Sequence, residues 1–172
     1  KKMIKYEETQ KKLFIFGSNF PEMLQQDNKY KQARFVFAPD LRQVPNSGFR
    51  DFKYLRFVIL PKVELLGEES FRGCKCLLIA IMPLVKEIGG NCFNYCRALS
   101  RICLGQLSEL KEGTFNDSFL YYYDCSGLKK VGTDCFYMVN SIILGPNTII
   151  EQQKSYTMFN NVCDFRSNVQ TP

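Results

Sequence analysis

Eight cysteines are the side chains with the greatest chemical potential in this chain of 172 residues. Thiolates act as nucleophiles, pair as disulfides or bind zinc, and four of them lie close together in the sequence, at Cys74, Cys76, Cys92 and Cys96. Histidine is absent, so no Cys-His or Ser-His dyad and no imidazole metal site can form. The single residue between Cys74 and Cys76 is also tighter than the usual zinc-ligand gap of about two to four.

Carboxylates are the remaining candidates for catalysis. Glu64, Glu68 and Glu69 form the nearest thing to an acidic group, but paired catalytic carboxylates need a cleft that separates their pKa values. The Gly89-Gly90 pair lacks the Lys-Ser/Thr of a phosphate-binding loop. We interpret the glutamates as a solvated turn surface, and we expect a protein that is not an enzyme and binds no cofactor or metal.

The elements that must position these side chains repeat along the chain. Phenylalanine recurs at steps of 22, 22, 22 and 21 residues, at Phe49, Phe71, Phe93, Phe115 and Phe136. Each phenylalanine follows an apolar stretch, a proline or small residue, and two spaced aliphatic residues. A fixed period of this length is typical of a solenoid, in which one repeat cannot bury its own apolar side and stacks on its neighbours.

Within one unit, the pattern predicts a short strand, a turn at the proline, and a compact return. Proline suits the end of a strand, where no ladder donor is needed. Glycine follows the second aliphatic residue at Gly67, Gly89 and Gly132. We interpret these glycines as a tight bend that requires positive φ.

The pattern L-x-x-I-x-I-P-x-x-V-x-x-I-G-x-x-x-F-x-x-C-x-x-L, found between Phe35 and Ile150, resembles the BspA-like class of leucine-rich repeats. The resemblance implies an α/β solenoid: a curved stack of units of about 22 residues with a parallel sheet on its concave side and short helical or irregular returns. It also implies a surface or secreted protein that binds other macromolecules. It brings no catalytic residues.

We expect one leucine-rich repeat domain over residues 1–172. Residues 1–33 form an N-terminal cap or degenerate repeat, 34–150 the repeats, and 151–172 a C-terminal cap, because terminal repeats meet water on one side. A 22-residue step from Gly17 to Pro39 puts Phe14 and Phe16 in strand phase. No signal-peptide h-region follows Lys1, and the longest apolar stretch, Cys76–Val85, is about half of a membrane span.

Four of the eight cysteines fit the repeat as compact apolar side chains. Cys74 and Cys96 hold the core position after the phenylalanine, and Cys92 and Cys135 the small-residue position before it. We expect buried, reduced thiols, with disulfides or the zinc site as alternatives. Reduced thiols favour an intracellular or anaerobic setting, whereas the resemblance favours a cell-surface or secreted protein, so the localisation stays open.

Strand alternation separates a core side from an outward side. Core positions are Val36, Val58, Leu60, Ala80, Met82, Ile102 and Leu104, with Tyr123 on the same side. The outward positions, which we predict to bind a partner from the concave sheet, are Phe35 and Phe37, Phe57 and Ile59, Ile79 and Ile81, Arg101 and Cys103, and Tyr122 and Asp124. The first three pairs are wholly apolar, and such patches usually mark a protein interface.

Three occupants of this apolar row remain open: the N-terminal segment, a second copy, or another protein. We expect another protein, bound by a non-catalytic interaction module; a permanent structural subunit of a larger assembly and a surface adhesin or receptor-like protein are the alternatives. The net charge of +6 and the lysines near the N-terminus allow an acidic partner there. Nucleic acid is not expected, because no basic run is interleaved with aromatic residues.

Overall fold

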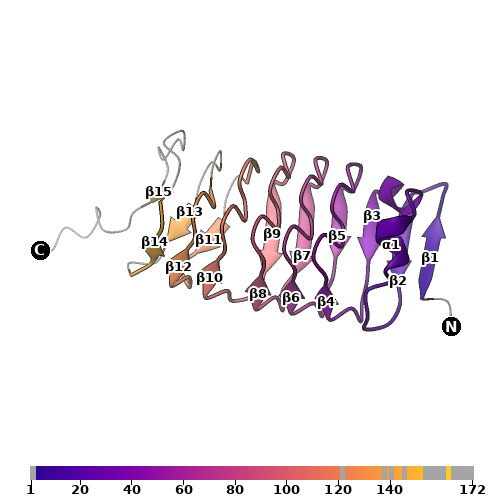
Figure 1. The fold of residues 1–172 in the computed structure, drawn as a ribbon, viewed down its shortest axis with the longest axis horizontal. Coiled ribbons are helices and arrows are strands. Elements are labelled where there is room, and N and C mark those ends of the chain that lie inside the picture. The colour runs from indigo at the N-terminus through magenta and orange to yellow at the C-terminus, as the bar shows by residue number, and fades with distance from the viewer. Residues whose placement is uncertain are drawn as a thin grey trace, which may run out of the picture.

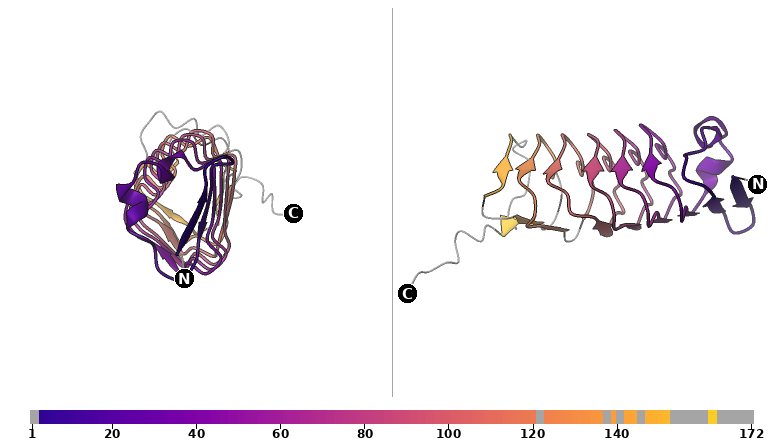
Figure 2. Two further views of the ribbon diagram at one scale, coloured as in Figure 1. Left: turned by 90° about the vertical axis from the view of Figure 1, so that its right-hand side faces the viewer. Right: turned by 90° about the horizontal axis from the view of Figure 1, so that it is seen from below.

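The structure, a computed structural model, describes residues 3–120, 123–136, 139, 142–144, 147–152 and 162–163. Of residues 124–125, 142–144 and 162–163 only the backbone is described. The coils follow one another along a single axis (Figure 1) and superimpose when viewed down it (Figure 2). Equivalent strand residues are 22 apart, as in the pairs Val36–Val58 and Val58–Ala80, so the predicted solenoid is confirmed.

The main sheet has six strands. The first two form an N-terminal hairpin, and each of the next four coils adds one strand. Their order is β1 (Ile4–Glu7), β2 (Lys12–Ile15), β3 (Phe35–Phe37), β5 (Phe57–Ile59), β7 (Ile79–Met82) and β9 (Arg101–Leu104). Only β1 is antiparallel to its neighbour, and β2 to β9 are parallel. We call this the six-stranded sheet.

Shorter strands form the second side of the coil and the C-terminal end. One sheet contains β4 (Gln43–Val44), β6 (Leu65–Leu66) and β8 (Glu87–Ile88), and another β10 (Glu109–Leu110), β12 (Lys130–Val131) and β14 (Ile149–Ile150). The last sheet contains β11 (Tyr123–Cys125), β13 (Ile142–Leu144) and β15 (Val162–Cys163). In the part of the chain that is described, helix is limited to α1 (Met23–Gln26) and the 3-10 turn η1 (Tyr30–Gln32).

The returns are held from coil to coil by backbone hydrogen bonds. The nitrogens of Phe49, Phe71 and Phe93 donate to carbonyl oxygens of the next coil over 2.7, 2.9 and 2.8 Å. These bonds set the repeating phenylalanines above one another in the core, where all three are fully buried. The same side chains therefore fill the interior and set the spacing of the coils.

The glycines after the second aliphatic residue do not have positive φ, and that interpretation was wrong. A Cβ on Gly67 or Gly89 would collide with backbone atoms of the preceding coil, so close approach requires these glycines. Positive φ occurs two residues later, at Glu69 (54°), Asn91 (54°) and Asp134 (52°). The bend and the close approach are thus separate requirements.

The strand phase predicted for Phe14 and Phe16 was also wrong. Leu13 pairs with Val36, a step of 23 residues instead of 22. Leu13 and Ile15 are therefore fully buried, while Phe14 lies on the outward side and Phe16 is exposed. The first coil contains α1 and η1 in place of a regular return, and it is one residue longer than the coil that follows.

The six-stranded sheet ends at β9, although the chain makes further coils. The segment Ser118–Leu120 is one residue shorter than its counterpart Cys96–Leu99, and β11 belongs to another sheet. Of the expected core positions, those on β3 to β7 are fully buried, but Ile102 and Leu104 are only partly buried. Leu104 and Tyr123 line a groove of about 660 Å³ at this break. The ring centroids of Tyr123 and Phe115 are 5.5 Å apart, which places Tyr123 on the core side as expected.

Candidate interaction surface

The outward side of the six-stranded sheet carries apolar side chains from four neighbouring strands. We call this set the sheet face; it consists of Phe14, Phe35, Phe37, Phe57, Ile59, Ile79 and Ile81. Phe57 is 39% exposed and Ile81 38% exposed, and the other five are half-buried. Their neighbours in the same strands, such as Val58 and Ala80, are fully buried. The alternation thus divides each strand between the core and the surface.

The half-burial of this row comes from contacts within the row. Neighbouring strands lie about 4.8 Å apart, so side chains in register pack against each other and still present one edge to solvent. The rings of Phe14 and Phe35, which are diagonal neighbours on β2 and β3, also have centroids only 6.3 Å apart. The result is a continuous apolar surface and not a set of isolated side chains.

Phe14 is the member of the sheet face that the sequence prediction missed. The 22-residue period assigned it to the core, and the true step of 23 residues turns it outward. Lys5 on β1 places its ammonium 5.7 Å from the centre of the Phe14 ring, a cation–π contact at the edge of the face. The charge marks where the apolar surface ends on the N-terminal side.

The C-terminal members of the predicted site are placed less completely. Arg101 and Cys103 are exposed on β9, beside the apolar rows. Tyr122 lies outside the described residues, and the side chain of Asp124 is not described. Because β11 is in a different sheet, the structure brings Phe35 through Cys103 together on one sheet but does not add Asp124 to it.

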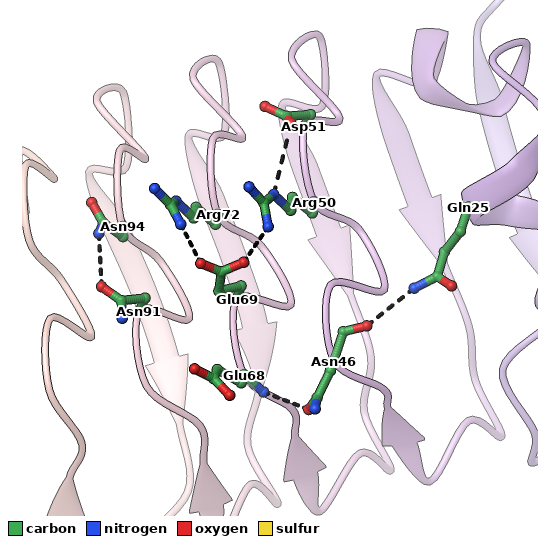
Figure 3. A network of polar contacts seen from close by, with 9 residues as sticks. All are labelled: Gln25, Asn46, Arg50, Asp51, Glu68, Glu69, Arg72, Asn91 and Asn94. Atoms are coloured by element: carbon green, nitrogen blue, oxygen red, sulfur yellow. Dashed lines mark hydrogen bonds and ion pairs between the residues drawn. The ribbon is translucent and has the colours of Figure 1, made fainter.

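The described N-terminal segment does not lie across the sheet face. It extends the sheet sideways as β1 and β2, and α1 lies at the N-terminal end of the solenoid (Figure 1). Leu24 of α1 is fully buried in the core, and Gln25 donates to the carbonyl oxygen of Asn46 over 3.1 Å (Figure 3). Residues 3–33 therefore leave the face open.

The cysteines of the proposed zinc alternative do not converge. Cys74, Cys92 and Cys96 are buried in the core while Cys76 is exposed, and no three His, Cys, Asp or Glu side chains are grouped as metal ligands within the described part of the chain. The thiols of Cys74 and Cys96 donate to carbonyl oxygens over 3.1 and 3.2 Å. Burial raises the pKa of Cys92 to about 12, which suppresses the reactive thiolate.

The clustered glutamates link neighbouring coils. Glu69 accepts hydrogen bonds from both Arg50 and Arg72 (Figure 3). Glu64 lies between Lys86 at 2.6 Å and Arg42 at 3.4 Å, and the hydrogen bond from Lys86 lowers the pKa of the Glu64 carboxyl. These carboxylates pair with basic side chains, mostly of neighbouring coils, which is an arrangement for structural cross-links.

The repeats and their coil geometry match a known family. A model of the BspA type leucine-rich repeat region matches residues 27–143 in six copies. The chain belongs to this family. BspA-type repeats typically mediate binding and are generally non-catalytic. No curated protein matches the sequence.

Solved structures of bacterial leucine-rich repeat proteins share the fold. The Treponema pallidum leucine-rich repeat protein has a TM-score of 0.59 at 19% identity, over 81% of this chain and 67% of that one. A leucine-rich cell surface protein of Faecalibacterium prausnitzii has a TM-score of 0.58 at 20% identity, over 69% and 34%. The pneumococcal vaccine antigen PcpA has a TM-score of 0.59 at 15% identity, over 67% and 31%. The present chain thus spans about a third of the length of the last two.

Within the described residues, none of the helices has the length and apolar character for a membrane span.

Proposed function

We propose that this BspA-type chain is a non-catalytic interaction module that binds another protein through the sheet face. The observation that supports the proposal is the continuous apolar surface of the six-stranded sheet, open in the described structure. A sheet surface that met only water would carry polar side chains at alternate positions. Here seven of the eight outward positions on β2, β3, β5 and β7 carry aromatic or aliphatic side chains, and Lys12, in register with Phe35, is the eighth.

The energetics favour burial of this surface. Removal of apolar area from water contributes roughly 25 cal/mol per Å², so seven packed side chains are a substantial source of binding free energy. Phe57 and Ile81 retain the largest exposed fractions in the row and would lose the most solvent contact. Arg101, at the C-terminal edge, adds a residue type that often dominates interface energies.

The setting of the interaction is part of the same proposal. One structural relative is described as a cell surface protein and another as a vaccine antigen, which supports display at the cell surface. A permanent structural subunit of a larger assembly would bury the same face. Stoichiometric co-purification that resists salt distinguishes the permanent assembly from a transient adhesin or receptor.

A crosslinking pull-down from native cell extract tests the proposal with two matched variants. Ile81→Asp places a charge on the sheet face, and Leu65→Asp places the same charge on β6; both wild-type side chains are 38% exposed. A specific partner should be lost with Ile81→Asp and retained with Leu65→Asp, with circular dichroism showing both variants folded. Equal capture by both variants contradicts the proposal, and capture of a second copy of the chain identifies self-association instead.

A further inference from the structure

A row of basic side chains borders the sheet face at the edge where the chain enters β3 and β5. Lys31, Lys53 and Lys75 hold the same position in three successive coils, 22 residues apart, in the turns that precede the strands. Arg34 and Arg56 are the residues directly before β3 and β5. We call these five side chains the basic ridge. Four of them are exposed, and Lys31 is half-buried.

The five side chains of the basic ridge have no carboxylate partner in the described structure, in contrast to many other basic side chains. Lys62 pairs with Asp40, Arg97 with Asp117, and Glu64 and Glu69 each hold two basic side chains. Among the described residues, none of the five ridge side chains forms an ion pair within 4.0 Å.

Asp51 is the carboxylate nearest to the ridge along the chain. Asp51, two residues before Lys53, has its carboxylate 3.9 Å from the Nε of Arg50. It therefore offsets a charge outside the ridge. The five ridge side chains thus form one row of positive charge that no described carboxylate balances within 4.0 Å. Like charges this close repel each other, and a partner with carboxylates would relieve that repulsion.

The opposite edge of the sheet face has no such excess. After β3 and β5 the corresponding charges are Asp40 and Lys62, which pair with each other at 2.7 Å. Face-to-face pairing of two copies would set the ridge against another ridge or against this neutralised edge. Neither arrangement supplies the missing carboxylates, so the ridge favours a different protein over a second copy on this face.

We propose that the sheet face and the basic ridge together bind an acidic amphipathic helix of a partner protein, lying along the solenoid axis. This inference rests on the proposed function. A helix turn rises about 5.4 Å and the coils are about 4.8 Å apart, so one helix turn matches nearly one coil. Its apolar stripe would cover Phe35, Phe57 and Ile79, and carboxylates at i, i+3 or i+4, and i+7 would lie beside the ridge.

The combination of the two surfaces selects this class of partner. A nucleic acid or an anionic polysaccharide would contact the ridge and leave Phe57 and Ile81 in water. An uncharged apolar segment would bury the sheet face and leave the ridge unpaired. Arg34 and Arg56 can each form two parallel hydrogen bonds to a carboxylate, which fixes the register of the helix as well as adding energy.

Selection from a displayed library of helical peptides of about 20 residues tests the inference. The targets are the wild-type chain, the ridge variant Lys53→Glu/Arg56→Glu, and the face variant Ile81→Asp. Lys86→Glu/Lys129→Glu is the control, because it makes the same change in net charge away from the ridge. Peptides selected on the wild type are then titrated against each target by fluorescence anisotropy at low and high salt.

The wild type should enrich peptides whose apolar stripe is flanked by Asp and Glu. Such peptides should bind the ridge variant at least about tenfold more weakly, lose affinity with added salt, and bind the control variant unchanged. Enrichment without acidic residues, no enrichment, or equal binding to the ridge and control variants overturns the inference. If the acidic-helix inference fails but Ile81→Asp still abolishes the binding of a captured partner or peptide, the sheet face keeps its proposed function. If Ile81→Asp leaves that binding unchanged, the proposed function fails together with the inference.

Sedimentation with vesicles that contain phosphatidylserine separates a membrane surface from a protein helix. We expect the wild type to stay in the supernatant at the salt concentration where the selected peptides bind. The inference is overturned in favour of an anionic lipid surface if the wild type binds the vesicles, the ridge variant does not, and the selected peptides fail to compete with the vesicles for the wild type.

Discussion

The ring of Phe71 lies parallel to the ring of Phe93, with centroids 5.3 Å apart and planes inclined by 5°. Phe49 and Phe115 continue the stack on either side, at 5.2 and 5.6 Å. Offset stacking at such separations is a favourable arrangement of aromatic rings. Backbone hydrogen bonds hold the same residues in place, so each coil presents its neighbour with a preformed surface for the next ring.

Truncation at the centre of this stack should be costly. Phe93→Ala removes a fully buried ring that has a stacked partner on both sides. We expect a loss of about 3 to 5 kcal/mol in the free energy of unfolding, measured by urea denaturation followed by circular dichroism. Phe57→Ala, at the exposed sheet face, should cost about 1 kcal/mol or less. Equal transitions for the two variants would contradict the assignment of core and face.

The adjacent glycines Gly89 and Gly90 should respond differently to the same substitution. A Cβ on Gly89 would collide with the backbone of Glu68, whereas a Cβ on Gly90 would meet its nearest atom, the oxygen of Glu112, at 3.4 Å. Gly89→Ala should therefore lower the free energy of unfolding strongly. Gly90→Ala should leave the free energy of unfolding within about 0.5 kcal/mol of wild type or raise it slightly, as measured by urea denaturation. A larger loss for Gly90→Ala would refute the close approach of the coils.

The repeating features of the fold were predictable because each coil imposes the same constraint. The burial of Val58 and Ala80 follows from alternation within a strand and from one period. The features that depart from the period were not predictable. Phe14 turns outward because its coil is one residue longer, and Leu104 is partly exposed because the next coil is one residue shorter. The sequence shows the change of length but not how the chain absorbs it.

The candidate site divides in the same way. The apolar row from Phe35 to Ile81 could be found from strand phase alone. The basic ridge could not, although Lys31, Lys53 and Lys75 recur at the repeat spacing. The sequence drew attention to the lysines of the N-terminus, yet Lys5 and Lys29 there form ion pairs with Glu7 and Asp27. Which charges are paired depends on side-chain contacts, within a coil for Lys5 and Lys29 and between coils for Lys62 and Lys86, and the repeat pattern does not state them.

Thiol reactivity should follow burial. Cys76 and Cys103 are exposed, whereas burial raises the pKa of Cys135 to about 11 and shields Cys74 in the core. With iodoacetamide near pH 8, peptide mapping by mass spectrometry should find the two exposed thiols alkylated first, because the thiolate is the reactive form. The buried thiols should react at comparable rates only after unfolding in urea. Early modification of Cys74 in the native protein would contradict its burial in the core.

Acid should weaken the link that Glu64 makes between coils. The hydrogen bond and charge of Lys86 lower the pKa of Glu64 from 4.5, so the folded state binds this proton less readily than the unfolded state does. The stabilisation is present above pH 4.5 and is lost as the pH falls through the folded-state pKa. Glu64→Gln should therefore reduce the fall in unfolding temperature between about pH 7 and pH 3, by a small amount that added salt removes, since the pair is exposed. Glu87→Gln is the control, because Glu87 is an exposed carboxylate without an ion pair in the described structure. An equal effect of the two substitutions would show that the Glu64 link contributes nothing to stability.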